Sequence, residues 1–201
     1  MRLRFDHGQL RMPENTTPRP HLDPRDPFVL DIRRLGGPGS MLTDRRRVPA
    51  PAGLRHDLVG VPEGAPLDLE LRLESATEGV LVTGTVTTTV TGECGRCLEP
   101  VTDEFAVEVC ELFAYPGSTT AETTDEDEVD RVVDDLIDVE PVVRDAVVLG
   151  LPQTPLCRPD CAGLCPTCGQ RLNDVPSGHA HEVLDPRWAA LTEWNARDRT
   201  D

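Results

Sequence analysis

Residues 67–74 read Leu-Asp-Leu-Glu-Leu-Arg-Leu-Glu, in which each leucine is followed by a charged residue. This period of two predicts a strand with one buried face and one wet face. After a Glu-Gly turn, residues 80–90 place valines on one face and threonines on the other. Residues 105–112 alternate again, with Phe105, Val107 and Val109 sharing a face. Because short turns join the three runs, they predict an antiparallel β-meander.

Shorter elements surround the meander. The apolar run Phe28–Ile32 predicts a first strand, and a Gly-rich turn and Arg45–Arg47 follow it. The prolines after these arginines exclude a helix there. Residues 132–137 are spaced for a short helical turn. A helix begins near Pro141, a residue that suits a first helical turn, and ends at Gly150.

We expect this helix to pack on the sheet through an apolar stripe. The stripe comprises Val142, Val143, Ala146, Val147 and Leu149. Asp185-Pro186 predicts the start of a last short helix, with Trp188 and Trp194 as packing anchors rather than base-stacking platforms.

These elements predict an α+β fold in which an antiparallel β-meander is packed by a helix. Residues 1–26 have no periodicity and are expected to form a flexible N-terminal arm. Residues 27–152 would form the α+β domain, including a mobile acidic loop at 116–130. This loop is either only solvated or a phosphate mimic that guards the basic arm. Residues 153–201 would form a metal segment, a zinc knuckle, and the short C-terminal helix.

The most specific chemical signal is the run Cys157-x3-Cys161-x3-Cys165-x2-Cys168. Its prolines and glycines allow the chain to wrap four sulfurs around one ion at about 2.3 Å. The spacing differs from common ferredoxin runs, which favours zinc over an iron–sulfur cluster. Four thiolates leave no open position for water, so we expect a structural rather than a catalytic zinc.

Three other groups of possible ligands have open interpretations. Cys94 and Cys97 could share a metal with two later cysteines, form a redox pair, or simply lie in a turn. His179 and His181 could replace a cysteine ligand or be merely exposed. Cys110 lies in strand register and is expected in the core.

The charge of the chain is unevenly distributed. The formal net charge is −16; residues 1–56 hold eleven Arg and six acids, and residues 57–201 hold nine Arg and thirty acids. Such a chain could touch nucleic acid locally while its body is repelled by phosphate. The candidate RNA-binding residues are Arg33, Arg34, Arg45, Arg46, Arg47 and Arg96. A solvated surface that pairs with nearby acids is the alternative for the five arginines at 33–47.

Several classes of function find no support in the sequence. No run of eighteen apolar residues predicts a membrane span, and no signal peptide is visible at Met1–Phe5. The compartment is therefore expected to be reducing, which favours metal ligands over disulfides. No phosphate-binding Gly loop, Ser-His-Asp pattern or carboxylate pair stands out, so we expect neither an enzyme nor a small-molecule substrate.

Four motifs together resemble the YceD family, the large ribosomal RNA subunit accumulation proteins, in its actinobacterial form. They are Gly92–Pro100 (G-E-C-G-R-C-L-E-P), Ile137–Pro152, Pro155–Gly169 and Asp185–Leu191. The resemblance covers residues 27–195. Many members carry the four-cysteine segment and some lack it, which implies that the metal stabilises that segment. The resemblance also implies a role in large-subunit rRNA accumulation in the bacterial cytoplasm, with no catalytic residues to assign.

Two main functional hypotheses follow. The first is a non-enzymatic ribosome-assembly factor that binds pre-ribosomal RNA or a large-subunit protein. The second is an acidic protein–protein adaptor without RNA contact. A third and weaker hypothesis is a thiol redox protein that uses Cys94 and Cys97.

Overall fold

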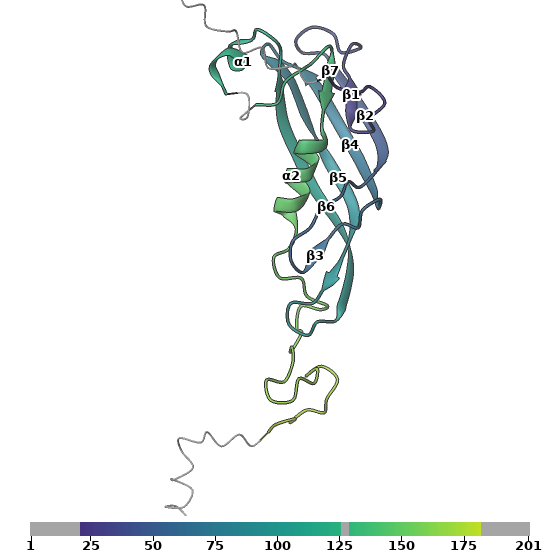
Figure 1. Ribbon diagram of the computed structural model, residues 1–201, viewed down its shortest axis with the longest axis vertical. Helices are drawn as coiled ribbons and strands as arrows, with labels where there is room; N and C mark the ends of the chain where they lie inside the picture. The colour runs from purple at the N-terminus through teal and green to yellow at the C-terminus, as the bar shows by residue number, and fades with distance from the viewer. Residues whose placement is uncertain (1–20, 126–128, 182–201) are drawn as a thin grey trace, which may run out of the picture. The chain divides into compact units, whose positions relative to one another are not determined.

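A computed structural model describes residues 21–125 and 129–181 of the chain, and its α+β architecture confirms the predicted fold class (Figure 1). The elements in chain order are β1 (Val29–Asp31), β2 (Met41–Pro49), β3 (Val59–Gly60), β4 (Pro66–Ser75), β5 (Gly79–Glu93), β6 (Pro100–Ala114), α1 (Thr119–Thr123), β7 (Leu136–Asp138) and α2 (Glu140–Gly150). The flexible arm expected at 1–26 lies outside the described residues up to position 20. The C-terminal helix expected from Asp185, with Trp188 and Trp194, also lies outside the described residues.

The strands form two sheets. In the larger sheet, β2, β4, β5 and β3 are neighbours in that order, and β6 also pairs with β5. The three predicted strands of the meander are therefore β4, β5 and β6. The smaller sheet joins β1 to β7 in antiparallel register, with Leu30 opposite Ile137. The first strand, predicted at Phe28–Ile32, is confirmed as β1.

The chain divides into two compact units, each with its own buried side chains. The first comprises the described parts of Met1–Val48, Leu69–Val86 and Glu108–Asp145. Leu69, Leu71 and Leu73 of β4 are buried there, as the alternation predicts, together with Val80 and Val82 of β5. A Cβ atom at Gly84 would lie 2.1 Å from the carbonyl oxygen of Glu70, so only glycine lets β4 and β5 approach this closely here.

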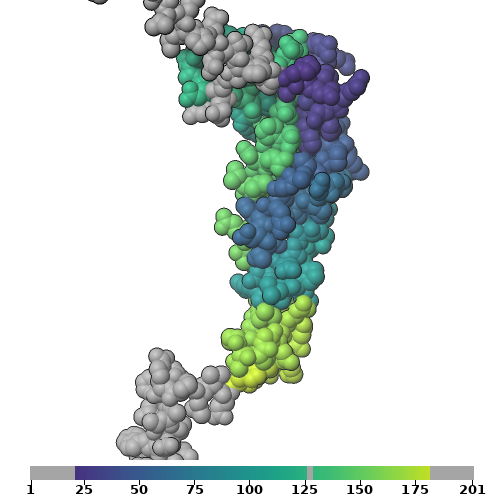
Figure 2. Space-filling view, in the orientation of Figure 1, coloured from purple at the N-terminus to yellow at the C-terminus, as the bar shows by residue number. Residues whose placement is uncertain are grey.

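The second unit comprises Pro49–Asp68, Thr87–Val107 and the described part of Ala146–Asp201. Its buried apolar residues include Leu54, Val59, Val90 and Leu151. A Cβ at Gly150 would lie 3.0 Å from the ring of Phe105 and 3.1 Å from Val107, so the end of α2 contacts β6, as predicted. In Figure 2 the yellow-green C-terminal segment of this unit lies directly against the teal end of the β5–β6 hairpin.

Four local predictions need correction. Arg45–Arg47, for which no strand was predicted, lie in β2, and residues 136–138 form strand β7 instead of a helical turn. Cys110 is exposed, because β6 buries the face that carries Val109. Leu149 is 82% exposed and does not belong to the buried stripe of α2.

The acidic stretch 116–130 contains local structure. Helix α1 begins after Ser118, whose side-chain oxygen accepts a hydrogen bond from the Ala121 N–H at 3.2 Å. The backbone N–H of Thr120 donates to the Glu78 carboxylate at 3.0 Å. Part of the predicted acidic loop is therefore a capped helical turn, and residues 126–128 lie outside the description.

Candidate metal centre

The tip of the β5–β6 hairpin is a cysteine knuckle, formed by Cys94-Gly95-Arg96-Cys97-Leu98. The Cys94 N–H donates to the Glu99 carbonyl at 2.8 Å, and the Leu98 N–H donates to the Cys94 carbonyl at 2.9 Å. Leu98 closes the turn with a φ of 61°, in the left-handed region that favours glycine. This backbone directs both thiols to the same side, where one ion could bind both.

Residues 165–169 repeat the same knuckle. The Cys165 N–H donates to the Gln170 carbonyl at 2.8 Å, and the Gly169 N–H donates to the Cys165 carbonyl at 2.8 Å. Gly169, with a φ of 71°, occupies the position of Leu98. The two Cys-x2-Cys turns therefore share both their hydrogen bonds and their left-handed closing residue. Each supplies two of the four ligands that a tetrahedral site needs.

The first knuckle meets the segment that follows α2 and forms a group of four thiols, called here the tetrathiolate site: Cys94, Cys97, Cys157 and Cys161. The Sγ atoms of Cys94 and Cys161 lie 3.8 Å apart, and those of Cys97 and Cys157 lie 3.5 Å apart. A tetrahedron with metal–sulfur bonds of about 2.3 Å has sulfur–sulfur edges of about 3.8 Å. The spacing of the thiols therefore fits a tetrahedral ion such as Zn²⁺.

Buried side chains and hydrogen-bond donors surround the tetrathiolate site. Cys94, Cys97 and Cys161 are 0%, 1% and 1% exposed, and Leu156, Leu164 and Val101 pack against them. The Asn173 amide donates to Cys161 Sγ at 3.3 Å, while its oxygen accepts the Ala162 N–H at 3.0 Å. Arg96 donates to the Cys161 carbonyl at 2.9 Å. Such outer contacts hold ligands in place and offset the negative charge of four thiolates.

The pKa values of the thiols reflect this surrounding. Burial opposes ionisation of Cys94, but backbone N–H groups of Cys157, Arg96 and Cys97 outweigh it and lower its pKa to about 6. Cys157 has a pKa raised to about 12, first by burial and then by the neighbouring thiols. Four adjacent thiols cannot all ionise without a cation between them, so a divalent ion is the natural counter-charge.

The second knuckle meets a His-x-His pair in a group called here the Cys2His2 site: Cys165, Cys168, His179 and His181. Cys168 Sγ lies 3.4 Å from His179 Nε2, which lies 3.0 Å from His181 Nε2. Metal–nitrogen bonds of about 2.0 Å require nitrogen–nitrogen edges of about 3.3 Å, so this donor set also fits a tetrahedral ion. The N–H groups of Cys168 and Thr167 donate to Cys165 Sγ and lower its pKa to about 6.

The two groups divide the four cysteines that the sequence suggested for one site. Cys157 and Cys161 lie in the tetrathiolate site, whereas Cys165 and Cys168 lie in the Cys2His2 site. The division occurs at Gly163, where φ is 79° and the carbonyl accepts the Leu172 N–H at 2.9 Å. Of the open interpretations, the structure favours the shared site for Cys94 and Cys97. In the sequence, the repeated Cys-x2-Cys turn and the His-x-His spacing are the features that could have indicated two groups of ligands.

One ion pair links the two knuckles. Arg171 follows the second knuckle and donates to the carboxylate of Glu99, which follows the first, at 3.1 Å. Leu164 and Arg171 also form an antiparallel bridge that closes the second knuckle. Both groups of possible ligands therefore belong to the same compact unit.

Several of the candidate RNA-binding arginines already have partners within the chain. Arg33 pairs with Asp31 at 2.6 Å, Arg46 with Asp44 at 2.6 Å, and Arg45 with Glu70 at 3.6 Å. Arg46 also donates to the carbonyl oxygens of Pro27 and Val29. Arg34 and Arg47 are exposed. Arg96 belongs to the other unit and helps to position Cys161.

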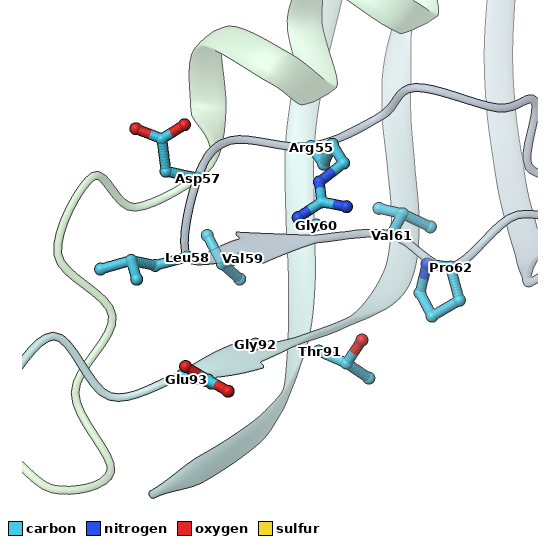
Figure 3. A pocket seen from close by; sticks show the side chains of 10 residues that line it. All are labelled: Arg55, Asp57, Leu58, Val59, Gly60, Val61, Pro62, Thr91, Gly92 and Glu93. Carbon is cyan, nitrogen blue, oxygen red and sulfur yellow. The ribbon is translucent and has the colours of Figure 1, made fainter. Parts of the chain in front are cut away.

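A surface cavity of about 390 Å³ lies beside β3 and the end of β5, lined by residues 55, 57–62 and 91–93 (Figure 3). Two of the residues that line it, Val59 and Gly92, are paired between β3 and β5, and a Cβ at Gly92 would lie 2.2 Å from the Leu58 carbonyl oxygen. Its charged residues are Arg55, Asp57 and Glu93, and no cysteine or histidine lines it. None of the residues that line the cavity therefore belongs to either group of metal-ligand residues.

Comparison with known proteins gives a consistent match. The family model described as "Large ribosomal RNA subunit accumulation protein YceD" matches residues 82–193. Uncharacterized proteins of Mycobacterium tuberculosis and Mycobacterium bovis are each 55% identical over 168 residues, which cover 83% of this chain and 81% of theirs. The uncharacterized protein YlbN of Bacillus subtilis is 30% identical over 115 residues, 55% of this chain and 65% of its own. No solved structure matches significantly. Among the described helices, none is long and apolar enough to cross a membrane.

Proposed function

The chain belongs to the YceD family of large ribosomal RNA subunit accumulation proteins, and from this premise we propose that it is a non-enzymatic, cytoplasmic factor for large-subunit assembly. It would act by binding pre-ribosomal RNA or a large-subunit protein. The family match is the observation that carries this proposal. It spans most of β5, all of β6 and α2, and all eight residues of the two metal-ligand groups.

We further propose that the tetrathiolate site holds a structural zinc ion. Sulfur ligands at tetrahedral spacing are the donor set that Zn²⁺ takes in closed sites. With four thiolates the ion would have no position open to a substrate or a water molecule, which supports a structural role. With the ion bound, the four cysteines would hold the segment after α2 against the tip of the β5–β6 hairpin. A contact surface formed by this segment and the hairpin tip would then have a fixed geometry.

The charge pairing on the surface favours a basic protein as the partner. At least three of the six candidate RNA-binding arginines, Arg33, Arg45 and Arg46, already pair with carboxylates of this chain. A guanidinium group engaged in this way must give up its partner before it can bind a phosphate. The excess of thirty acids over nine arginines beyond residue 56 would in turn attract a basic ribosomal protein. The adaptor hypothesis is therefore the version that the observations support best.

Depletion of the protein in its own cells tests the ribosomal role. We expect the ratio of large-subunit to small-subunit rRNA to fall, and free large subunits to decrease in sucrose gradients. Restoring the wild-type chain should reverse both changes. An unchanged rRNA ratio and normal subunit profiles after complete depletion would contradict the proposal.

Crosslinking distinguishes the two kinds of partner. The adaptor hypothesis predicts protein crosslinks from the acidic residues and no ultraviolet RNA crosslinks at Arg45, Arg47 or Arg96. A matched variant in which Arg45 and Arg47 are replaced by Gln should then bind the large subunit as well as the wild type. RNA crosslinks at these positions, together with weaker binding of the variant, would identify RNA as the partner.

A further inference from the structure

The Cys2His2 site differs from the tetrathiolate site in its exposure to solvent. In the tetrathiolate site three ligands are at most 1% exposed and Cys157 is half-buried. In the Cys2His2 site Cys168 and His181 are exposed, His179 is half-buried, and only Cys165 is buried. A chelator or water molecule can therefore reach the second group more easily than the first, in which only Cys157 is partly exposed.

The two groups also differ in their outer contacts. Asn173 donates to a tetrathiolate ligand, and Arg96 fixes the backbone beside it. In the Cys2His2 group the described hydrogen bonds from neighbouring residues reach Cys165, from the N–H groups of Thr167 and Cys168. Each histidine ring contacts another ligand of its own group instead of an outer carboxylate or carbonyl. Loss of outer contacts typically weakens metal binding about 10- to 100-fold.

The chain around the two histidines has little else to hold it. Between residues 174 and 181 no side chain is buried. The described backbone bonds in this stretch are local: the Asp174 N–H donates to Arg171, and the His179 N–H donates to Pro176. Ligation of His179 and His181 to an ion shared with Cys165 and Cys168 would be the main contact that fixes the stretch.

From these contrasts we propose that Cys165, Cys168, His179 and His181 form a second, separate Zn²⁺ site that exchanges its metal readily. The tetrathiolate site retains its ion when the Cys2His2 site is empty. Occupancy of the second site then determines whether residues 174–181 are ordered, so available zinc controls the conformation of the chain that leads to the C-terminus. The second site is independent of the ribosomal role, and its contrast with the tetrathiolate site rests on the structural zinc proposed there.

Native mass spectrometry of the full chain, reconstituted with Zn²⁺ under reducing conditions, tests the proposal. The wild type should carry two zinc ions. The His179→Ala/His181→Ala variant should carry one, as should Cys94→Ser if it folds. The Cys110→Ser variant replaces an exposed cysteine outside both groups and should carry two. One zinc in both the wild type and the double-histidine variant would overturn the proposal.

Zinc release to the chromogenic chelator 4-(2-pyridylazo)resorcinol tests the difference between the sites. We expect two phases of equal amplitude, with rates that differ at least about tenfold, and only the slow phase in the double-histidine variant. Hydrogen exchange on the wild type after the fast phase should show lost protection at Asp174 and His179, with the Cys94 and Leu98 amides still protected. A single release phase, or simultaneous loss of protection at both knuckles, would contradict separate sites.

Discussion

Removing the distant half of the tetrathiolate site should cost about 4 kcal/mol of unfolding free energy. The double variant Cys157→Ser/Cys161→Ser leaves the knuckle at the hairpin tip intact but breaks its connection to the segment after α2. Cys97 and Cys157 are 60 residues apart in sequence. A cross-link that closes a loop of this length removes about 14 cal/mol/K of entropy from the unfolded chain, which corresponds to about 4 kcal/mol at 25 °C.

Loss of the Cys2His2 site should lower the unfolding free energy by a smaller amount. Cys168 and His179 are 11 residues apart, and a loop of this length corresponds to about 3 kcal/mol. Cys110→Ser provides the matched control, because Cys110 is exposed and belongs to neither group. It should change the unfolding free energy by less than about 0.5 kcal/mol.

Urea unfolding followed by circular dichroism measures these differences, once with saturating zinc and reductant and once with EDTA. The wild type and Cys157→Ser/Cys161→Ser should differ by about 4 kcal/mol with zinc and by less than about 1 kcal/mol with EDTA. If the zinc-loaded proteins differ by less than about 1 kcal/mol, or if the difference persists in EDTA, the metal is not a cross-link between these segments.

Three further substitutions test individual contacts. Leu98→Gly should raise the unfolding free energy by up to about 1 kcal/mol, because a left-handed backbone costs a side chain about 1–2 kcal/mol and glycine's unfolded-state entropy returns part of the gain. Asn173→Ala should lower zinc affinity at the tetrathiolate site about tenfold in a chelator competition, because the donor to Cys161 Sγ is lost. Asp130→Asn should raise the melting temperature at pH 7, because burial and then the charge of Glu111 raise the pKa of Asp130. A raised pKa means that the folded state prefers the protonated acid, so the difference should close as the pH falls through the folded pKa toward the ordinary aspartate pKa of 3.8.

Each of these substitutions has an outcome that would count against its premise. A less stable Leu98→Gly protein would show that the exposed leucine side chain contributes more than its backbone costs. Unchanged zinc affinity in Asn173→Ala would show that the hydrogen bond from Asn173 to Cys161 Sγ does not contribute to metal binding. A stability difference for Asp130→Asn that stays constant from pH 4 to pH 8 would exclude a charge effect.

The meander was predictable because its signal is local. Leu67, Leu69, Leu71 and Leu73 alternate with charged residues within one strand, and all four are buried. Strand β2 was missed because its inward positions include charged residues. Asp44 and Arg46 are half-buried together, and their bidentate pairing offsets the cost of leaving water. A hydrophobic pattern cannot reveal a strand of this kind.

The residues of the candidate site were predictable, but their grouping was only partly so. Spacing within a knuckle is a local property, and the sequence shows two Cys-x2-Cys turns without ambiguity. The choice of partner for each knuckle depends on how the segment after α2 returns to the hairpin tip, which no local pattern contains. Four cysteines within twelve residues therefore suggested one site, although the reversal at Gly163 divides them.

The separation of the tetrathiolate ligands has a consequence for synthesis of the protein. The thiols of Cys94 and Cys97 leave the ribosome at least 60 residues before Cys157 and Cys161, a delay of about 3–12 s at ordinary rates of translation. During this interval the hairpin tip carries an incomplete ligand set. An ion could bridge the two segments only after the segment beyond α2 has been made, so binding of the proposed zinc would follow the synthesis of Cys161.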